Sequence, residues 1–364
     1  MIGKPKYYSL KEIKKRNATY NVIFGERSNG KTYALLVESI KQFMVDKSTM
    51  VYLRRWKEDV IGRRAKNIYQ GLINNNEIAN LTNNKYTTVI YNSGEFYLAN
   101  YGEDDKPIYN KDDLLGYSMS LSETEHNKSS SYPTVKTIVF DEFLSKGLYL
   151  QDEFVLFINT VSTIVRKRTD VSIYLLGNTV NRYCPYFAEM GLDNIKNMKQ
   201  GSIDVYKYGD TGLTVAVEYC KSLKNSKENN FYFAFNNPKL EMITKGAWEL
   251  NIYPHLPMKY KPKNVLFTYF IEFNDELFQC EIVKVNHIVF TYIHEKTTEL
   301  KNPTKDLIYS FDKTPLMNYN SNILKPQNKI QTKIKWFFTT DRVFYQDNKV
   351  GDSIANFIKE CKRG

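Results

Sequence analysis

The stretch "VIFGERSNGKTYALL", from Val22 to Leu36, holds two glycines five positions apart, followed at once by a lysine and a threonine. It fits the pattern G-x-x-x-x-G-K-[ST] at every fixed position. Glycines in such a loop let the backbone wrap closely around phosphate oxygens, so that successive N–H groups and a helix N-terminus face the anion. The stretch therefore predicts a phosphate-binding loop made of Gly25, Glu26, Arg27, Ser28, Asn29, Gly30, Lys31 and Thr32.

The sequence on either side of the loop fits this prediction. Upstream, "TYNVIF" (residues 19–24) is short, β-branched and aromatic, which is typical of a buried strand. Downstream, residues 31–45 carry apolar side chains at helical spacing, and "MVYLRR" (residues 50–55) then predicts a second strand. The order strand, loop, helix, strand predicts a βαβ unit. In that unit Lys31 would reach the β- and γ-phosphates, and the Thr32 hydroxyl would ligate Mg²⁺.

The segment "TVKTIVFDEFLSKG" (residues 134–147) predicts a buried strand that ends in two carboxylates. Asp141 would hold the Mg²⁺ shell, and Glu142 would orient or deprotonate the attacking water. Kinases and small GTPases with a phosphate loop generally lack this glutamate, whereas ATP-driven motors tend to carry it. We therefore expect ATP and Mg²⁺ as the ligands of an ATP hydrolase.

A third strand is predicted over residues 171–176, just before Gly177 and Asn178. A polar side chain at the tip of a strand beside the phosphate strand can sense the γ-phosphate or hold the lytic water. Asn178 fits that role, although asparagine after glycine is also common in turns.

The segment "DEFVLFINTVSTIVRKRT" (residues 152–169) predicts an amphipathic helix that ends in three cations. Cations at this position interact favourably with the helix dipole. Alternatively, Arg166 or Arg168 projects across a subunit boundary as an arginine finger. The sequence leaves both interpretations open.

The net charge of +11 is unevenly distributed along the 364 residues. Residues 1–70 hold 16 lysines and arginines against 6 aspartates and glutamates, a balance of +10. Residues 258–364 hold 17 against 12, a balance of +5. A positive field concentrated at one end of the chain favours a polyanionic partner, although a merely solubilising surface would look the same.

Cysteine spacing and hydropathy exclude several other classes of protein. The chain holds no run of about 18 apolar residues, so we expect no membrane helix. Its four cysteines are scattered without a CxxC pair, which argues against structural zinc and a disulfide framework. This usage fits a reducing cytoplasm.

The motifs together resemble the genome-packaging ATPases (encapsidation proteins) of phi29-like tailed phages, distant relatives of the large terminase ATPases. The segments that carry the resemblance are "NVIFGERSNGKTYA", "VYLRRWKED", "KSSSYPTVKTIVFDEF", "VRKRTDVSIYLLGNTV" and "CPYF", between about residues 20 and 190. The resemblance implies an α/β P-loop NTPase domain of the ASCE type, with a parallel-rich sheet. It also implies a homomeric ring of five subunits on the portal (connector) of an empty prohead, which drives double-stranded DNA inward.

The same resemblance assigns roles to single residues. Arg27 matches an arginine that contacts phosphate within its own subunit. Arg166 matches the finger that reaches a neighbouring subunit's ATP, and Lys128 lies where a second trans-acting basic residue is expected. Lys57 falls where packaging motors offer lysines to the DNA backbone, and we place Arg63 and Arg64 with it as candidate DNA contacts.

The chain is predicted to divide into an ATPase domain (1–205), a linker region (206–257) and a C-terminal domain (258–364). Breakers at Pro238, Gly246, Pro254 and Pro257 suggest the linker. The C-terminal domain has three strand-like runs, "NVLFTYFIEF", "ELFQCEIVKV" and "HIVFTYIHE", and a final helix over residues 352–364. The resemblance implies an α+β RNase H-like fold for it.

Nuclease activity is not expected of the C-terminal domain. Its candidate carboxylates lie within one hairpin, where alternation along the strands sends some away from others. They are Glu272, Asp275, Glu276 and Glu281. We interpret the domain as a docking module, with a structural RNA on the prohead as a candidate partner.

The leading hypothesis is therefore an ATP-driven translocase of double-stranded DNA, located in the host cytoplasm and transiently attached to the prohead. A helicase or recombination ATPase would use the same chemistry, but most helicases need a second motor domain. A nucleotide-gated assembly protein would not need a water-activating carboxylate such as Glu142.

Overall fold

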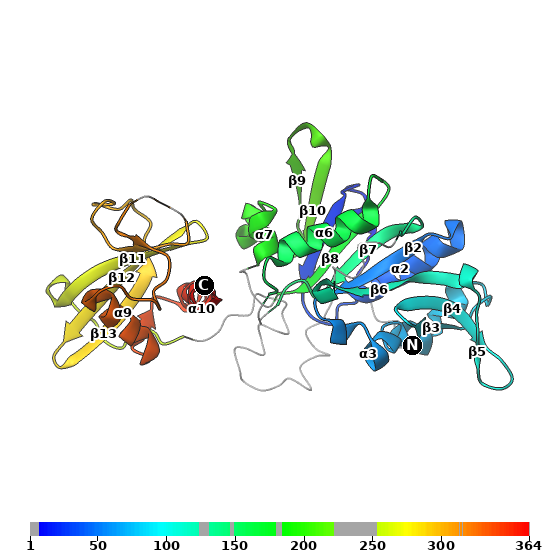
Figure 1. Cartoon of the computed structure of the whole chain (residues 1–364), viewed down its shortest axis with the longest axis horizontal. Helices are drawn as coiled ribbons and strands as arrows, with labels where there is room; N and C mark the ends of the chain where they lie inside the picture. The colour runs from blue at the N-terminus through cyan, green and yellow to red at the C-terminus, as the bar shows by residue number, and fades with distance from the viewer. Residues whose placement is uncertain are drawn as a thin grey trace. The chain divides into compact units, whose positions relative to one another are not determined.

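The computed structural model describes residues 7–123, 131–145, 149–179, 184–221, 253–312, 314 and 316–363. The chain divides into two compact units, Met1–Glu249 and Leu250–Gly364. Each unit is built on its own β-sheet (Figure 1). Within the part of the chain that the structure describes, no helix is both long enough and apolar enough to cross a bilayer.

The sheet of the first unit has the strand order β3-β4-β6-β2-β7-β8-β1-β10-β9, with β5 paired to β4. Six neighbouring strands at its centre run parallel. They are β6 (Leu114–Ser120), β2 (Thr49–Arg54), β7 (Val135–Asp141), β8 (Ser172–Asn178), β1 (Tyr20–Gly25) and β10 (Leu213–Tyr219). The outer strands pair antiparallel and are β3 (Thr88–Asn92), β4 (Glu95–Tyr101), β5 (Pro107–Ile108) and β9 (Ile203–Tyr208).

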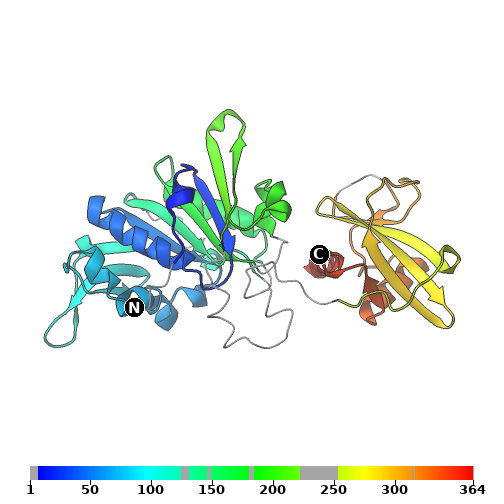
Figure 2. The ribbon, with the colours of Figure 1, turned by 180° about the vertical axis from the view of Figure 1, so that it is seen from behind.

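Helices cover both faces of this sheet. Alternate residues of β1 enter two different cores, because successive side chains of a strand point to opposite faces. Val22 and Phe24 pack on the side of α6 (Glu153–Val165), whereas Ile23 packs on the side of α2 (Lys31–Asp46). Helix α6 lies in front of the sheet in Figure 1, and α2 lies in front of it in Figure 2.

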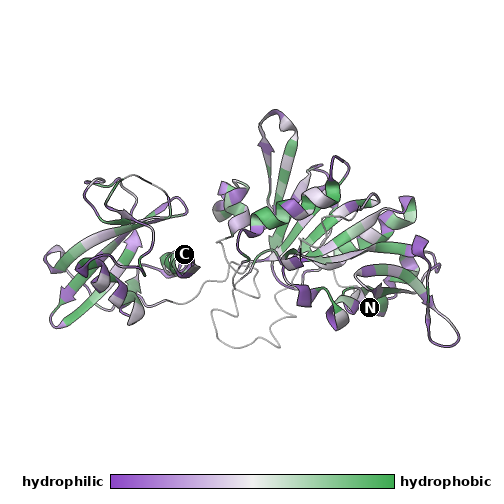
Figure 3. Ribbon diagram, in the orientation of Figure 1, coloured by the Kyte–Doolittle hydropathy of each residue, from purple (hydrophilic) through white to green (hydrophobic). Residues whose placement is uncertain are grey.

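Burial on both faces explains the sequence of the central strands. Such strands read as nearly continuous apolar runs rather than as alternating ones, and β1 is buried at five of its six positions. Figure 3 shows hydrophobic residues along the central strands. The predicted βαβ unit and the parallel-rich sheet are confirmed. Among the described residues, the remaining α-helices of this unit are α1 (Lys11–Lys14), α3 (Gly62–Lys66), α4 (Gln70–Asn74), α5 (Glu77–Leu81) and α7 (Pro185–Glu189).

The predicted linker, residues 206–257, is wrong for its first part. Strand β10 pairs in parallel with β1, and β9 forms an antiparallel hairpin with β10, so the large sheet extends to Tyr219. The β-branched and aromatic residues of "LTVAVEY" explain the strand. Proline and glycine breakers farther along the chain had suggested a linker for the whole region. Residues 222–252 lie outside the described part of the chain.

The second unit contains a six-stranded sheet in the order β15-β14-β11-β12-β13-β16. Its central three strands form an antiparallel meander, and all three were predicted from the sequence. The final helix was also predicted, and it begins at Asn348 rather than at residue 352. The elements are β11 (Val265–Phe273), β12 (Glu276–Val285), β13 (Ile288–Glu295), β14 (Ile308–Tyr309), β15 (Tyr319–Asn320), α9 (Lys329–Thr339), β16 (Val343–Tyr345) and α10 (Asn348–Arg363). The RNase H-like assignment stays a prediction.

Candidate active site

The predicted phosphate loop connects β1 to α2, and its two glycines are required by the local geometry. Gly30 has a φ of 88°, in the left-handed region that favours glycine, and it immediately precedes the first residue of α2. A Cβ atom at Gly25 would lie 2.9 Å from the Cβ of Cys220, the residue that follows the neighbouring strand β10. The loop therefore presents its backbone and the N-terminus of a 16-residue helix toward one place, which is the arrangement that binds phosphate.

Lys31 is buried, with 6% of its surface exposed. Its Nζ donates to the carbonyl oxygen of Glu26 at 2.8 Å, to Asn29 Oδ1 at 3.2 Å and to Asn178 Oδ1 at 3.3 Å. Burial lowers the pKa of Lys31, against the attraction of nearby anionic groups such as Asp141. Asn178, predicted from the end of the third strand, therefore lies beside the phosphate-loop lysine.

Hydroxyl and carboxylate oxygens converge next to this lysine. The Thr32 hydroxyl donates to Asp141 Oδ2 at 3.0 Å, and the Tyr52 hydroxyl donates to the same oxygen at 2.8 Å. Hydroxyl and carboxylate oxygens are the ligand types that Mg²⁺ prefers, so the donor set fits the predicted metal. Tyr52 was not predicted as a site residue from the sequence. Burial, followed by the charge of Asp141, raises the pKa of Tyr52 well above its ordinary value.

The side chain of Glu142 is half exposed (56%) and forms an ion pair with Arg54. Arg54 Nη2 lies 2.5 Å from Glu142 Oε2, and the same nitrogen lies 3.7 Å from Asp59 Oδ2. Glu142 itself has a φ of 58°, a value that is uncommon for a residue with a side chain. Arg54 was not predicted as a site residue, although it lies in the "VYLRR" segment that carries part of the family resemblance.

A cavity of about 740 Å³ joins these groups. It is lined by residues 27–33 of the phosphate loop and α2, by Asp141, Glu142, Leu144 and Ser145 after β7, and by Gly177 and Asn178. Its volume lies within the range of small-molecule sites. The cavity opens at the carboxyl ends of parallel strands, where ligands of open α/β sheets bind.

The other predicted catalytic cations lie in three different situations. Arg27 is exposed and lines the cavity. Arg166 ends α6 with a φ of 52°, and its backbone N–H donates to the Ser162 carbonyl at 2.8 Å. It is not among the residues that line the cavity of its own chain. Lys128 lies outside the described residues.

Arg168, the alternative candidate for the arginine finger, is hydrogen-bonded to the backbone of its own chain. Its guanidinium donates to four backbone carbonyls, at distances between 2.7 and 3.1 Å. The acceptors belong to Tyr132, Pro133, Val135 and Ile164. Arg168 therefore joins the end of α6 to the beginning of β7, which leaves Arg166 as the candidate finger.

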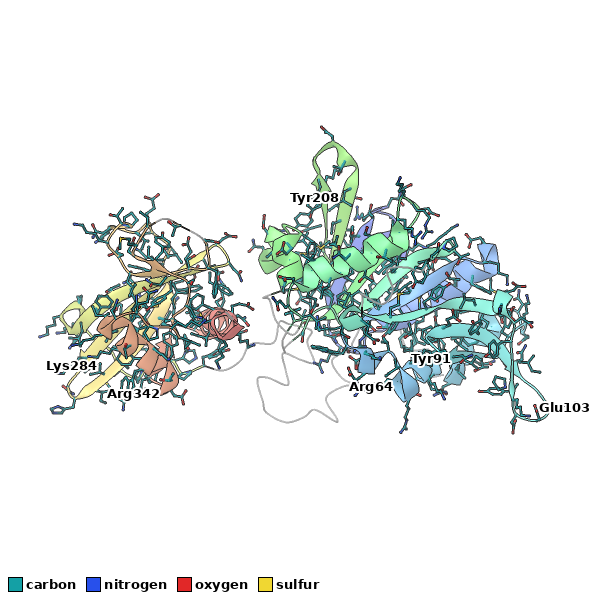
Figure 4. The ribbon with its side chains drawn as sticks, viewed as in Figure 1. Arg64, Tyr91, Glu103, Tyr208, Lys284 and Arg342 are labelled. Carbon is teal, nitrogen blue, oxygen red and sulfur yellow. The ribbon has the colours of Figure 1, made fainter. Side chains whose placement is uncertain are left out.

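The three candidate DNA contacts lie on the segment that follows β2. Lys57 begins a short 3₁₀ helix (Lys57–Asp59), and Arg63 and Arg64 belong to α3. Two of the three cations are already paired, since Lys57 Nζ lies 2.6 Å from Glu123 Oε1 and Arg64 Nη1 lies 2.6 Å from Asp59 Oδ1. Arg64 is labelled in Figure 4. Counting charges along the sequence did not reveal this local neutralisation.

The acidic side chains of the second unit bind separate partners. Glu281 accepts hydrogen bonds from Tyr260 and Gln279 and lies 3.7 Å from His294 Nε2. Glu276 accepts from Ser353 at 3.2 Å and pairs with Lys349 at 3.4 Å. Among the described residues, no group of three histidines, cysteines or carboxylates is close enough to hold a metal ion.

The family model described as "Podovirus DNA encapsidation protein (Gp16)" matches residues 2–231, which is more than half of the chain. The chain belongs to this family. The sequence is 28% identical over 189 residues to the DNA packaging proteins of Bacillus phages PZA and phi29. These matches cover 51% of this chain, and the chain spans about half the length (50%) of these relatives.

Two solved structures show that the likeness of fold extends over nearly the whole chain. The bacteriophage Phi-29 viral genome packaging motor assembly matches with a TM-score of 0.60 and 22% identity, covering 98% of this chain and 99% of that one. The Phi-28 gp11 DNA packaging motor matches with a TM-score of 0.53 and 18% identity, covering 99% of each. At these identities the likeness shows a shared fold.

Proposed function

We propose that this encapsidation-family chain is the ATP-hydrolysing subunit of a motor that drives double-stranded viral DNA through the portal of a preformed prohead. The observation that carries the proposal is the convergence of Lys31, Thr32, Asp141, Glu142 and Asn178 on one cavity. The relatives described as DNA packaging proteins support the choice of substrate. The motor would act in the host cytoplasm, transiently attached to the prohead.

The contacts of these side chains suggest how the site would work. Lys31 would exchange its bonds to Glu26, Asn29 and Asn178 for phosphate oxygens, so that its buried charge stays compensated. Thr32 and Asp141 would hold Mg²⁺, which neutralises charge on the β- and γ-phosphates when it is bound.

Glu142 would accept a proton from the attacking water or orient that water, and its carboxylate is paired with Arg54 in the structure. Turnover therefore requires the carboxylate to leave Arg54, and Asp59 is close enough to serve as an alternative partner for that arginine. Asn178 would be released from Lys31 to contact the γ-phosphate or the water.

The remaining predicted residues would contact phosphate groups, either of ATP or of DNA. Arg27 would contact phosphate within its own subunit, whereas Arg166 and Lys128 would reach the ATP of a neighbour in a ring of five subunits. Lys57, Arg63 and Arg64 would contact DNA phosphates, which bind proteins without regard to base sequence. The second unit would be a docking module without nuclease activity, with a prohead RNA as a candidate partner.

The experiment that tests the proposal combines the purified full chain with proheads that carry their portal, double-stranded DNA and ATP. DNA that has entered the prohead resists added nuclease, and its amount is measured on a gel. Wild-type protein should protect DNA only with ATP, and Glu142→Gln should protect none. ATP hydrolysis that DNA stimulates equally well without proheads, with no protected DNA, would instead favour a helicase-like activity.

A further inference from the structure

Two arginines, Arg54 at the end of β2 and Arg55 directly after it, contact the same loop in different ways. Arg54 pairs with the side chain of Glu142. Arg55 instead donates to the backbone of that loop, from Nη1 to the Glu142 carbonyl at 3.3 Å and from Nη2 to the Phe143 carbonyl at 2.7 Å. Successive side chains at a strand end point in opposite directions. Arg54 therefore reaches the Glu142 carboxylate, whereas Arg55 reaches the backbone of the same loop.

Arg55 is held rigidly by a buried carboxylate. Arg55 is 6% exposed and Glu153 is 2% exposed. Arg55 Nε donates to Glu153 Oε2 at 2.7 Å and Nη2 donates to Oε1 at 2.9 Å, which is the two-point geometry that fixes a guanidinium plane. The guanidinium carbon also lies 4.8 Å from the centre of the Tyr149 ring.

Glu153 is in turn fixed by the chain just before α6 and by a side chain of α7. It accepts the Leu150 backbone N–H at 2.7 Å and the Tyr186 hydroxyl at 2.9 Å. Glu153 is the first residue of α6, and Tyr186 belongs to α7. A buried network that is satisfied in this way specifies one arrangement of its members. The arrangement that it specifies here includes the position of the loop that carries Glu142.

The loop has a particular need for such support. Glu142 has a φ of 58°, a conformation that a residue with a side chain keeps only when its surroundings determine it. Its N–H donates to Asp141 Oδ1 at 3.0 Å, and the Phe143 N–H donates to the Leu176 carbonyl at 3.1 Å. Those bonds fix the two N–H groups, and Arg55 fixes the two carbonyls.

We propose that Arg55 is a positioning residue for Glu142, and that Glu153 holds Arg55 for this purpose. The inference rests on the proposed function of Glu142 as the group that acts on water. Through the two carbonyls, Arg55 sets the direction in which the Glu142 side chain leaves the backbone, and hence where its carboxylate meets the water. The alternative is a buried ion pair that stabilises the fold and has no influence on turnover.

The test uses variants that separate these two roles. Removing one member alone would leave a buried charge unpaired and is expected to destabilise the fold. The double variant Arg55→Met with Glu153→Gln removes both charges, and the new amide keeps an oxygen that can accept the Leu150 N–H. The variant Arg55→Lys keeps the positive charge, but a single ammonium cannot reproduce the fork that reaches Glu153 and both carbonyls.

We expect both variants to bind a non-hydrolysable ATP analogue with a Kd within about threefold of the wild type. Their kcat should fall by roughly 10- to 100-fold, because a small displacement of a catalytic group lowers the rate by such a factor. Rates are expressed per folded subunit, counted by analogue binding. The matched control is Asp46→Asn with Lys136→Met, which removes an exposed ion pair between α2 and β7. The control should leave kcat unchanged.

Wild-type kcat in folded Arg55→Lys, or in the folded double variant, would overturn the proposal. A loss of analogue binding equal to the loss of turnover would overturn it as well, because Arg55 would then act on the whole cavity. Failure of the proposed function looks different, because it would show as no hydrolysis by the wild type or as wild-type hydrolysis by Glu142→Gln.

Discussion

The cavity at the edge of the large sheet and the β11–β12 hairpin of the second unit both carry acidic side chains, but only the cavity gathers them with other functional groups. Asp141 lies within hydrogen-bonding distance of Thr32, and Glu142 lines the same cavity. In the hairpin, Glu276 pairs with α10 and Glu281 is bound by Tyr260 and Gln279.

Sheet topology explains the difference. The central strands of the large sheet are parallel, so β1, β7 and β8 all end at one edge. The loop after β1 meets the last side chains of β7 and β8 there. In an antiparallel hairpin, neighbouring strands run in opposite directions and alternate residues face opposite sides. Acidic residues that are close in sequence are then separated in space. The large sheet therefore gathers functional groups at the carboxyl ends of its strands, whereas the hairpin distributes Glu276 and Glu281 among separate partners.

The largest expected effect concerns Arg166, which would complete the cavity of a neighbouring subunit. Arg166→Ala should lower ATP turnover by about 10³- to 10⁵-fold, as loss of a finger acting in trans does in other P-loop enzymes. Mixing Arg166→Ala subunits with Glu142→Gln subunits should restore turnover, because a Glu142→Gln subunit can offer its arginine to an intact cavity. If subunit exchange is confirmed and the mixture stays inactive, Arg166 is only a cation at a helix end.

A smaller effect is expected for Lys31→Ala in nucleotide binding. Each hydrogen bond to a charged group contributes about 1.5–3 kcal/mol, so the Kd for ATP should rise by roughly 10- to 100-fold. Calorimetric titration measures the Kd, and unchanged affinity would remove Lys31 from the phosphate site.

Replacing the three candidate DNA contacts should weaken the salt dependence of DNA binding. Each phosphate contact contributes about 0.9 to the slope of log Kd against log salt, so replacing Lys57, Arg63 and Arg64 by alanine should flatten the slope by at most about 2.7. Arg63 should contribute more than the other two, because Lys57 and Arg64 are paired with Glu123 and Asp59. Fluorescence anisotropy with random-sequence duplexes checks this, and an unchanged slope would place the DNA surface elsewhere.

The smallest effect is expected in the second region and concerns stability alone. His294, with the Tyr260 and Gln279 hydrogen bonds, lowers the pKa of Glu281 to about 2. The stabilisation is therefore complete above the unfolded pKa of about 4.3 and is lost as the pH falls toward 2. Glu281→Gln should cost on the order of 1–2 kcal/mol at pH 6, and the difference from the wild type should vanish near pH 2.

Chemical denaturation of both proteins across this pH range measures the difference. The pKa of His294 is raised by Glu281, so the share of the stabilisation due to the charged histidine is lost as the pH rises through its folded pKa. ATP turnover of Glu281→Gln should equal that of the wild type. A loss of turnover without a loss of stability would contradict a purely structural role for this hairpin.

Local patterns were sufficient to predict the phosphate loop and the groups at the strand ends. Gly30, Lys31 and Thr32 follow from one short motif, and Asp141 with Glu142 follows from a buried strand that ends in two acids. The structure brings these residues to one cavity because strand, loop and helix are formed by residues that are close in sequence, and because parallel strands end at one edge.

The tyrosine and the arginine of β2, and the arginine that follows the strand, could not be assigned in this way. Tyr52, Arg54 and Arg55 contact the residues around Glu142 because β2 lies next to β7 in the sheet. Local sequence patterns do not predict the order of strands in a sheet, so these contacts could not be predicted. The contact between Arg55 and Glu153 joins residues 98 positions apart. The position of β10 beside β1 depends on strand order in the same way, which is why the predicted linker began too early.

We propose that the strand ends of the large sheet form a site that hydrolyses ATP, with Glu142 acting on water. The most direct test measures the Kd for ATP and the turnover rate of Glu142→Gln beside those of the wild type, with DNA and proheads present. We predict a Kd within about threefold of the wild type and turnover lower by about 10²- to 10⁴-fold, the range for loss of a general base. Turnover at the wild-type rate, with ATP still bound, would contradict the claim.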